Sequence, residues 1–215
     1  MTLQNTETST QSSREPLKEG FRPLGGAIYG VVAFVATFIL TTGYFTFRVT
    51  NETGSQFGLD EAFPVAQFVG YPFYNAHNVN TPIEFTSTGA VGTQIGMGVD
   101  SYFAFFNQLS AVTGFSINPL VFNAIPAVIL LLTGYIIAGR VTTPLSLKGS
   151  AVAGASVAVG YLPLFVLGAP LFRTEGSEFA AGPEIGVTLV FFGALFAVGF
   201  GGLGGYLRAK RASGR

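Results

Sequence analysis

The fold of this chain is decided by an uncharged run that reads LGGAIYGVVAFVATFILTTGYFTF from Leu24 to Phe47. In an α-helix, about 20 apolar residues rising about 1.5 Å each cross the roughly 30 Å hydrocarbon core of a bilayer. Tyr44, Phe45 and Phe47 close the run, where interfacial aromatic residues belong. The run therefore predicts a first membrane span over residues 24–47.

Three further apolar runs predict three more spans, at residues 119–139, 149–172 and 184–207. Pro126 predicts a kink inside the second span. Pro163 and Pro170 predict distortion in the far half of the third span. Small residues dominate the start of the third span and the end of the fourth, which predicts close helix contacts. The predicted fold class is all-α, an integral membrane bundle of four transmembrane helices.

The composition fits a protein whose natural solvent is the bilayer. Charged residues make up 10% and hydrophobic residues 49% of the chain, whereas about 25% are charged in an ordinary soluble domain. The net charge is zero, which gives no indication of nucleic-acid binding. The chain has no cysteine and one histidine, so disulfides, thiolate nucleophiles and a multi-histidine metal centre within one chain are excluded.

The basic residues are distributed unevenly between the two sides of the predicted bundle. Nine of the eleven fall in the N-terminal tail, the turn after the second span and the C-terminal tail: Arg14, Lys18, Arg22, Arg140, Lys148, Arg208, Lys210, Arg211 and Arg215. The positive-inside rule then predicts a multi-pass protein of the cell membrane with both termini in the cytoplasm. Residues 1–22 are predicted to be a disordered cytoplasmic tail, residues 23–207 the membrane domain, and residues 208–215 a basic cytoplasmic tail.

The segment 48–118 is too long for a bare connector, so we expect an extracellular helical or loop cap between the first two spans. Pro64 and Pro72 argue against one long helix in this cap. Short pieces in the membrane surface or packed on the mouth of the bundle fit better, followed by a loop or ribbon at 80–98. Asn51 begins the triplet Asn-Glu-Thr, which matches the N-glycosylation acceptor pattern on the predicted outer side.

The unusual polar chemistry of the cap is concentrated in residues 70–80. The candidate functional cluster consists of Tyr71, Tyr74, Asn75, His77 and Asn78. Because histidine titrates near neutral pH, one interpretation is a proton-sensitive or ligand-binding site. The alternative is an interfacial histidine bonded to a backbone carbonyl, with the asparagines in turn and cap roles.

A resemblance accompanies this cluster. The stretch GYPFYNAH at residues 70–77, following PLGGAIYGVVA at residues 23–33, resembles a family of uncharacterised haloarchaeal multi-span membrane proteins. Members are similar in span count and carry a Phe-Tyr-Asn-Ala-His stretch after the first span; some bear a loose transporter label. The resemblance implies a membrane fold and an archaeal, halophile host, and it supplies no catalytic residues.

These observations favour a non-enzymatic integral membrane protein whose specific function the sequence does not disclose. No acid–base pair or nucleophile constellation is present, and no charged residue occupies the middle of a predicted span. We expect no cofactor and no metal. The expected partner is the lipid bilayer, with homo-oligomer contacts or another membrane protein at glycine-rich helix faces as further expectations. The alternatives are a small-solute transporter or channel component, and an accessory subunit of a larger membrane complex.

Overall fold

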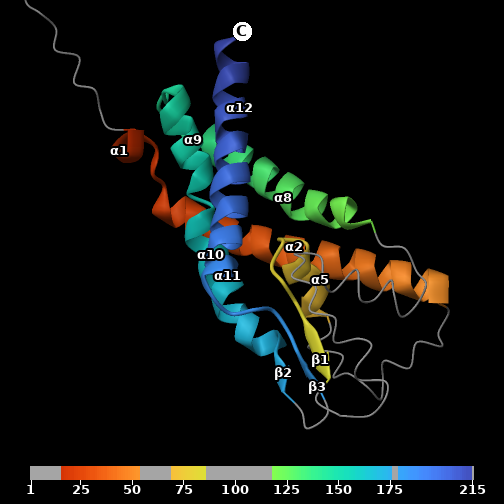
Figure 1. Ribbon diagram of the computed structural model, residues 1–215. Coiled ribbons are helices and arrows are strands. Elements are labelled where there is room, and N and C mark those ends of the chain that lie inside the picture. Colours follow the sequence, from red (N-terminus) through yellow and green to blue (C-terminus); the bar gives the residue numbers. More distant parts are fainter. Residues whose placement is uncertain (1–15, 54–68, 86–117, 176–178, 215) are drawn as a thin grey trace, which may run out of the picture.

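The computed structural model describes residues 16–53, 69–85, 118–175 and 179–214. Within these ranges four helices are long and apolar enough to cross a membrane: Pro23–Asn51, Pro119–Gly139, Leu147–Phe172 and Val187–Ser213. They coincide with the four predicted spans and confirm the predicted class of fold, a bundle of four membrane-crossing helices (Figure 1).

The first two spans are continuous helices. Helix α2 covers Pro23–Thr53 and is longer than the predicted span, and helix α8 covers Pro119–Gly139. At the start of α8 the Asn118 side chain accepts a hydrogen bond from the Leu120 N–H at 3.0 Å, which satisfies one of the free donors of the first turn. Pro126 lies inside α8 without ending it.

The third span is built from three pieces: helix α9 over Leu147–Ala155, helix α10 over Ala158–Gly168 and the 3-10 turn η2 over Ala169–Phe172. The interruption falls at Ser156, whose hydroxyl donates to the Val152 carbonyl at 3.0 Å. Such bonding back to the preceding turn disturbs a helix. The predicted distortion of the far half occurs at Pro170, whereas Pro163 stays inside α10.

The fourth span consists of helix α11 over Val187–Ala194, the π-helical turn η3 over Leu195–Phe200 and helix α12 over Gly201–Ser213. Helix α12 continues six residues beyond the predicted end at 207. Residues 208–213 of the predicted basic tail are therefore helical and form the last turns of α12.

The first and the last described helix reach the same end of the bundle. Helix α1, Pro16–Gly20, forms where a disordered tail was predicted. It packs on the start of α9, since the Glu19 carboxylate accepts hydrogen bonds from the Ser146 N–H at 2.7 Å and the Ser146 hydroxyl at 2.8 Å. At the same end Arg208 donates to the Tyr135 hydroxyl at 3.3 Å, so α12 finishes beside the end of α8. The predicted tail at 1–15 lies outside the described residues.

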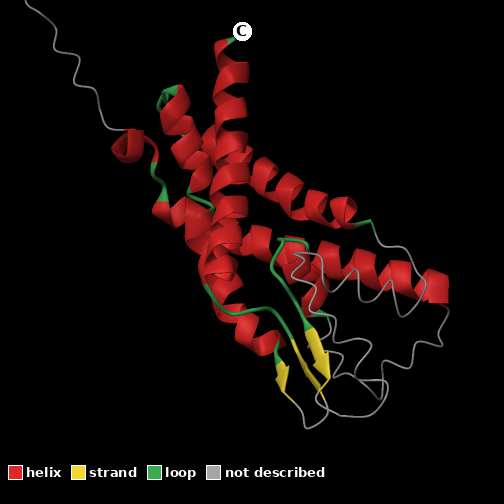
Figure 2. Ribbon diagram, viewed as in Figure 1, coloured by secondary structure: helices red, strands yellow, loops and turns green. Residues whose placement is uncertain are grey.

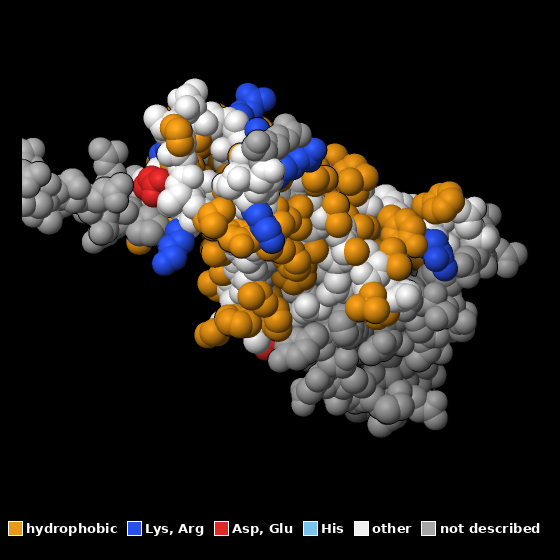
Figure 3. Space-filling view, turned by 90° about the horizontal axis from the view of Figure 1, so that it is seen from above, with side chains coloured by type: hydrophobic (Ala, Val, Ile, Leu, Met, Phe, Trp, Pro, Cys, Tyr) orange, Lys and Arg blue, Asp and Glu red, His pale blue; other side chains and the backbone are white. Residues whose placement is uncertain are grey.

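We call this the basic end, because it carries Arg22, Arg140, Lys148, Arg208, Lys210 and Arg211. Figure 1 shows α1 and the C-terminus in the same part of the molecule. Seen from above, blue Lys and Arg side chains are scattered among apolar and uncharged ones (Figure 3).

Glycines bring the backbones of neighbouring helices into direct contact. A Cβ on Gly30 would collide with the backbone of α10 around Val157, and one on Gly134 would collide with the backbone of α12 at Gly201. Aromatic contacts show that α2 and the third span run in the same direction, with Phe34 against Tyr161 of α10 and Phe38 against Phe172 of η2. The predicted close contacts of small residues therefore form within this chain.

A small antiparallel sheet lies at the end of the bundle opposite the basic end. Strands β1 (Ile83–Phe85), β2 (Thr174–Glu175) and β3 (Phe179–Ala181) have the order β1-β3-β2 (Figure 2). The sheet joins the segment after residue 80, predicted as a loop or ribbon, to the connection between the third and fourth spans. Most of the cap at 48–118 lies outside the described residues, including the expected pieces around residues 60–68.

Candidate functional site

Residues 70–81 form a re-entrant segment that enters the bundle and leaves it on the same side. Gly70 lies against the Phe172 ring at the end of the third span, and Asn80 lies beside Glu184, whose N–H donates to its carbonyl at 2.8 Å. Between them His77 reaches Tyr161. Tyr161 lies 14 residues after Leu147 and 11 before Phe172, so the segment descends about halfway along the third span.

This part of the predicted cap is packed inside the bundle, deeper than the expected position in the membrane surface or on the mouth of the bundle. Helix α5, Gly70–Asn75, has every residue buried, and its Phe73 ring packs on Phe34 and Phe38 of α2. Irregular backbone at membrane depth is tolerated only where protein surrounds it. Aromatic side chains of the spans provide that surrounding here.

The return of the chain depends on Asn78. Its φ of 61° is left-handed, a conformation in which asparagine is enriched. The Val79 N–H then donates to the Tyr74 carbonyl at 3.1 Å and the Asn78 N–H to the Asn75 carbonyl at 3.0 Å. These bonds close the turn after α5 and leave its buried backbone groups paired.

His77 makes a hydrogen bond with each ring nitrogen. Nδ1 lies 2.7 Å from the Phe73 carbonyl oxygen and Nε2 lies 2.6 Å from the Tyr161 hydroxyl. Because a carbonyl can only accept, Nδ1 carries the proton. In the neutral ring Nε2 is then the acceptor, and the Tyr161 hydroxyl donates to it. The side chain is 0% exposed.

Aromatic rings surround the imidazole. Its centroid lies 4.8 Å from Phe73, 4.8 Å from Phe165 and 5.0 Å from Phe196. Burial lowers the pKa of His77 to about 4, and the hydrogen bond to the Phe73 carbonyl acts in the opposite direction. His77 is therefore neutral at pH 7. This geometry corresponds to the second interpretation of the histidine, a ring bonded to a backbone carbonyl, placed inside the bundle.

Tyr74 provides a hydrogen-bond donor for a backbone carbonyl near the end of the third span. Pro170 has no N–H, and the Ala169 N–H turns to the Val166 carbonyl, which frees the Phe165 carbonyl from its usual helical partner. The Tyr74 hydroxyl donates to that freed oxygen at 2.8 Å. Burial raises the pKa of Tyr74, so the hydroxyl stays protonated and remains a donor.

The other three predicted residues bind different parts of the fold. The Tyr71 hydroxyl lies 3.5 Å from the Thr174 hydroxyl, and burial raises the pKa of Tyr71. Asn75 donates to the Val79 carbonyl at 3.4 Å. Asn78 accepts from the Asn123 side chain at 2.6 Å, which fixes the segment to α8. The five predicted residues thus share one segment, but they do not converge on one point.

Sequence reasoning missed the residues that the spans contribute, namely Tyr161, Phe165, Phe196 and Asn123. Tyr161 was visible as a tyrosine within an apolar run, and a buried tyrosine hydroxyl normally requires a partner. Asn51 lies exposed in the last turn of α2. Among the described residues no group of three or more His, Asp or Glu side chains could hold a metal ion.

Comparison with known protein families matches residues 1–212 to a family of unknown function, DUF7978. The chain belongs to that family. The match covers all four spans of this DUF7978 member together with its re-entrant segment. The predicted membership in a family without an assigned function is thereby confirmed, and the haloarchaeal origin stays a prediction. No curated protein and no solved structure matches the chain.

Proposed function

We propose that this DUF7978 member is a non-enzymatic protein of the cell membrane that acts as an accessory subunit or anchor. One observation carries the proposal: the only histidine of the chain is enclosed in the bundle with both nitrogens occupied. A catalytic or carrier group needs access to its substrate, and His77 is 0% exposed. The side chains that remain available lie on the outside of the bundle.

The proposed orientation places both termini in the cytoplasm. Its support is the basic end, where the start of α2, the turn after α8 and the end of α12 lie together. Cytoplasmic segments of membrane proteins carry an excess of Lys and Arg. The proposed host is an archaeal, salt-adapted cell, as the resemblance implies.

Cysteine labelling tests the orientation, because the natural chain contains no cysteine. Thr143→Cys lies in the turn at the basic end and Asn51→Cys at the far end of α2, and both positions are exposed. In intact cells a membrane-impermeant maleimide is expected to label Asn51→Cys alone, and lysis is expected to add Thr143→Cys. Labelling of Thr143→Cys in intact cells would reverse the orientation.

The accessory role predicts a partner in the plane of the membrane. Most glycines of the spans pack within the chain, but a Cβ on Gly43 or Gly199 would meet nothing within 4 Å. At these two positions, which face outward, the absence of a side chain lets another helix approach closely. The partner is proposed to be another membrane protein or a second copy of this chain.

Mild solubilisation followed by native mass spectrometry tests this role. A stoichiometric partner is expected to accompany the wild-type protein. Gly199→Leu adds a side chain at an outward-facing position without entering the bundle, so it is expected to release the partner while the thermal midpoint of the isolated protein stays unchanged. Ala124→Leu, which enlarges an exposed residue of α8 outside the two proposed positions, is the matched control. A homogeneous wild-type monomer under these conditions would remove the accessory role.

A second candidate function, solute transport, is favoured by discontinuities in the elements that surround His77. The interruption at Ser156 precedes Tyr161, the π-helical turn contains Phe196, and the re-entrant segment supplies the histidine. Broken helices form the binding sites of many transporters, and π-helical turns often mark functional sites. In the described part of the chain the buried hydroxyls of Thr41 and Thr81 have no hydrogen-bond partner.

Reconstituted vesicles separate the two functions. Transport predicts a flux of a small solute above that of empty vesicles and its loss in His77→Ala. The accessory role predicts equal flux in loaded and empty vesicles, with or without the histidine.

A further inference from the structure

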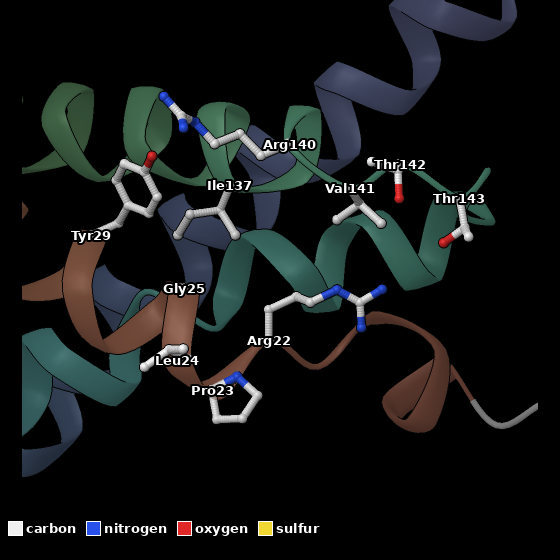
Figure 4. Close-up of a pocket in the computed structure, with 10 residues that line it drawn as sticks. All are labelled: Arg22, Pro23, Leu24, Gly25, Tyr29, Ile137, Arg140, Val141, Thr142 and Thr143. Carbon is white, nitrogen blue, oxygen red and sulfur yellow. The ribbon is translucent and has the colours of Figure 1, made fainter.

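A cavity of about 470 Å³ opens at the basic end, between the start of α2 and the end of α8. Figure 4 shows its lining: Arg22, Leu24 and Gly25 from the start of α2, Ile137 and Arg140 from the end of α8, and Thr143 from the following turn, among others. The lining includes no residue of the re-entrant segment. Neither the sealed core nor the proposed orientation accounts for it.

Two arginines provide the charge of this cavity. The Arg140 guanidinium lies 5.4 Å from the centroid of the Tyr29 ring, and the Arg22 guanidinium donates to the Phe21 carbonyl at 3.2 Å. In the described ranges neither guanidinium has a carboxylate partner. Glu19 is the nearest acid along the chain, and its carboxylate is bonded to Ser146. The cavity therefore presents positive charge that no described acid neutralises.

Backbone N–H groups at the start of α2 also favour binding of an anion in the cavity. The N–H of Arg22 is fixed by the Ser156 hydroxyl at 3.0 Å, and α2 begins at the next residue. The first N–H groups of a helix lack intrahelical partners and carry partial positive charge. Two of them, from Leu24 and Gly25, belong to residues that line the cavity.

The lining combines charged and apolar side chains, which suits an amphiphilic ligand better than a free ion. In Figure 4 Arg22 points toward Val141 and Thr143, Arg140 lies over Tyr29, and the apolar Ile137 lies between them. Leu24 is 75% exposed, and it continues the apolar surface of the spans to the mouth of the cavity. A ligand with a phosphate for the arginines and an apolar portion for this surface fits both parts.

The geometry points to a binding site for the phosphate-bearing headgroup of an anionic phospholipid, held by Arg22 and Arg140. Guanidinium groups bind phosphate oxygens through paired charged hydrogen bonds, and basic pockets between membrane helices hold acidic headgroups. The hydroxyls of Thr142 and Thr143 provide additional donors. This inference requires that the chain spans the bilayer, but it is independent of which side the basic end faces.

Lipid retention tests the site. The protein is reconstituted in vesicles of equal phosphatidylcholine and phosphatidylglycerol, extracted in mild detergent and weighed by native mass spectrometry. The wild type is expected to retain phosphatidylglycerol preferentially. Arg22→Gln with Arg140→Gln is expected to lower that retention by about tenfold or more, because two charged hydrogen-bonding partners are lost. Lys148→Gln with Arg211→Gln removes the same charge from the same end outside the cavity and is expected to change retention less than about twofold.

Three results would overturn the inference. The first is equal loss in the two charge-matched double variants, which would indicate diffuse attraction to the basic end. The second is unchanged retention in the Arg22 and Arg140 double variant. The third is full displacement of the lipid by millimolar inorganic phosphate, which would assign the cavity to a soluble phosphate. Thermal midpoints of both double variants verify folding. Arg22→Lys with Arg140→Lys, which keeps the charge but loses the paired guanidinium hydrogen bonds, is expected to retain an amount of lipid between those of the wild type and the Gln variant. Co-purification of a protein partner, measured on the same samples, reports separately on the accessory role.

Discussion

Replacing Tyr161 with Phe is expected to have opposite effects on stability in two backgrounds. In the wild type the change removes the hydroxyl that donates to His77 Nε2 at 2.6 Å, and it leaves the packing of the ring intact. In a His77→Phe background the same hydroxyl has already lost its acceptor, so its removal takes away a buried unsatisfied group.

The magnitude follows from the cost of an unpaired buried polar group, about 1–3 kcal/mol. Tyr161→Phe leaves one such group, the imidazole Nε2. His77→Phe leaves two, the Phe73 carbonyl and the Tyr161 hydroxyl, and the double variant leaves only the carbonyl. Tyr161→Phe is therefore expected to destabilise the wild type by about 1–3 kcal/mol and to stabilise His77→Phe by a similar amount. For a chain of this size the first change lowers Tm by about 2–12 °C.

The four proteins of this cycle are compared by thermal unfolding and by denaturation with increasing SDS in mixed micelles. Any misfit of the larger Phe ring at position 77 is common to both variants that carry it, so it cancels in their comparison. Tyr206→Phe, at an exposed tyrosine, is the control and is expected to change stability by less than about 0.5 kcal/mol. A Tyr161→Phe effect of the same sign and size in both backgrounds would refute the hydrogen bond to His77.

Three further predictions concern pH, helix contact and the N-terminal helix. The pKa of His77 is about 4 in the folded protein, below its ordinary value of 6.5, so the unfolded state binds more protons between these two pH values. The free energy of unfolding is therefore expected to rise by about 3 kcal/mol as the pH increases from 4 to 6.5. SDS denaturation at several pH values measures this rise, and an equal slope in His77→Phe would contradict it. Gly30→Ala is expected to destabilise by about 1–3 kcal/mol or more, because its Cβ collides with the backbone of α10, whereas Gly43→Ala faces open space and is expected to stabilise by up to about 1 kcal/mol; thermal midpoints that fall equally would oppose this reasoning. Glu19→Ala removes both bonds to Ser146 and is expected to speed tryptic cleavage within α1 several-fold, and unchanged cleavage would show that α1 is held by other contacts.

The spans were predictable because length and hydropathy are local properties. Any uncharged run such as Leu24–Phe47 must find an apolar environment, whatever the rest of the chain does. The common end of the two tails followed in the same way, since an even number of spans returns the chain to its starting side. The glycine contacts were predictable in kind, but the sequence did not say whether Gly30 or Gly43 would meet a neighbour.

The depth of the re-entrant segment was not predictable from its own residues. A short stretch with Asn75, His77 and Asn78 has the composition of an interfacial turn. It can be buried only because other residues provide hydrogen-bond partners and aromatic contacts for it. Those partners, Tyr161 and Phe196, lie 84 and 119 residues later in the chain. The interruption at Ser156 escaped prediction for a related reason, because a serine in a helix gives no local sign of whether its hydroxyl will bond back to the preceding turn.

The burial of the re-entrant segment has a consequence for how the protein is made. Residues 70–81 are synthesised before the third and fourth spans, so His77 lacks Tyr161, Phe165 and Phe196 when it first reaches the membrane. The segment can take its final position only after the helices that carry Tyr161 and Phe196 have been inserted. Assembly of this protein is therefore completed from its C-terminal half, and a chain that stops after α8 has no place to put the segment.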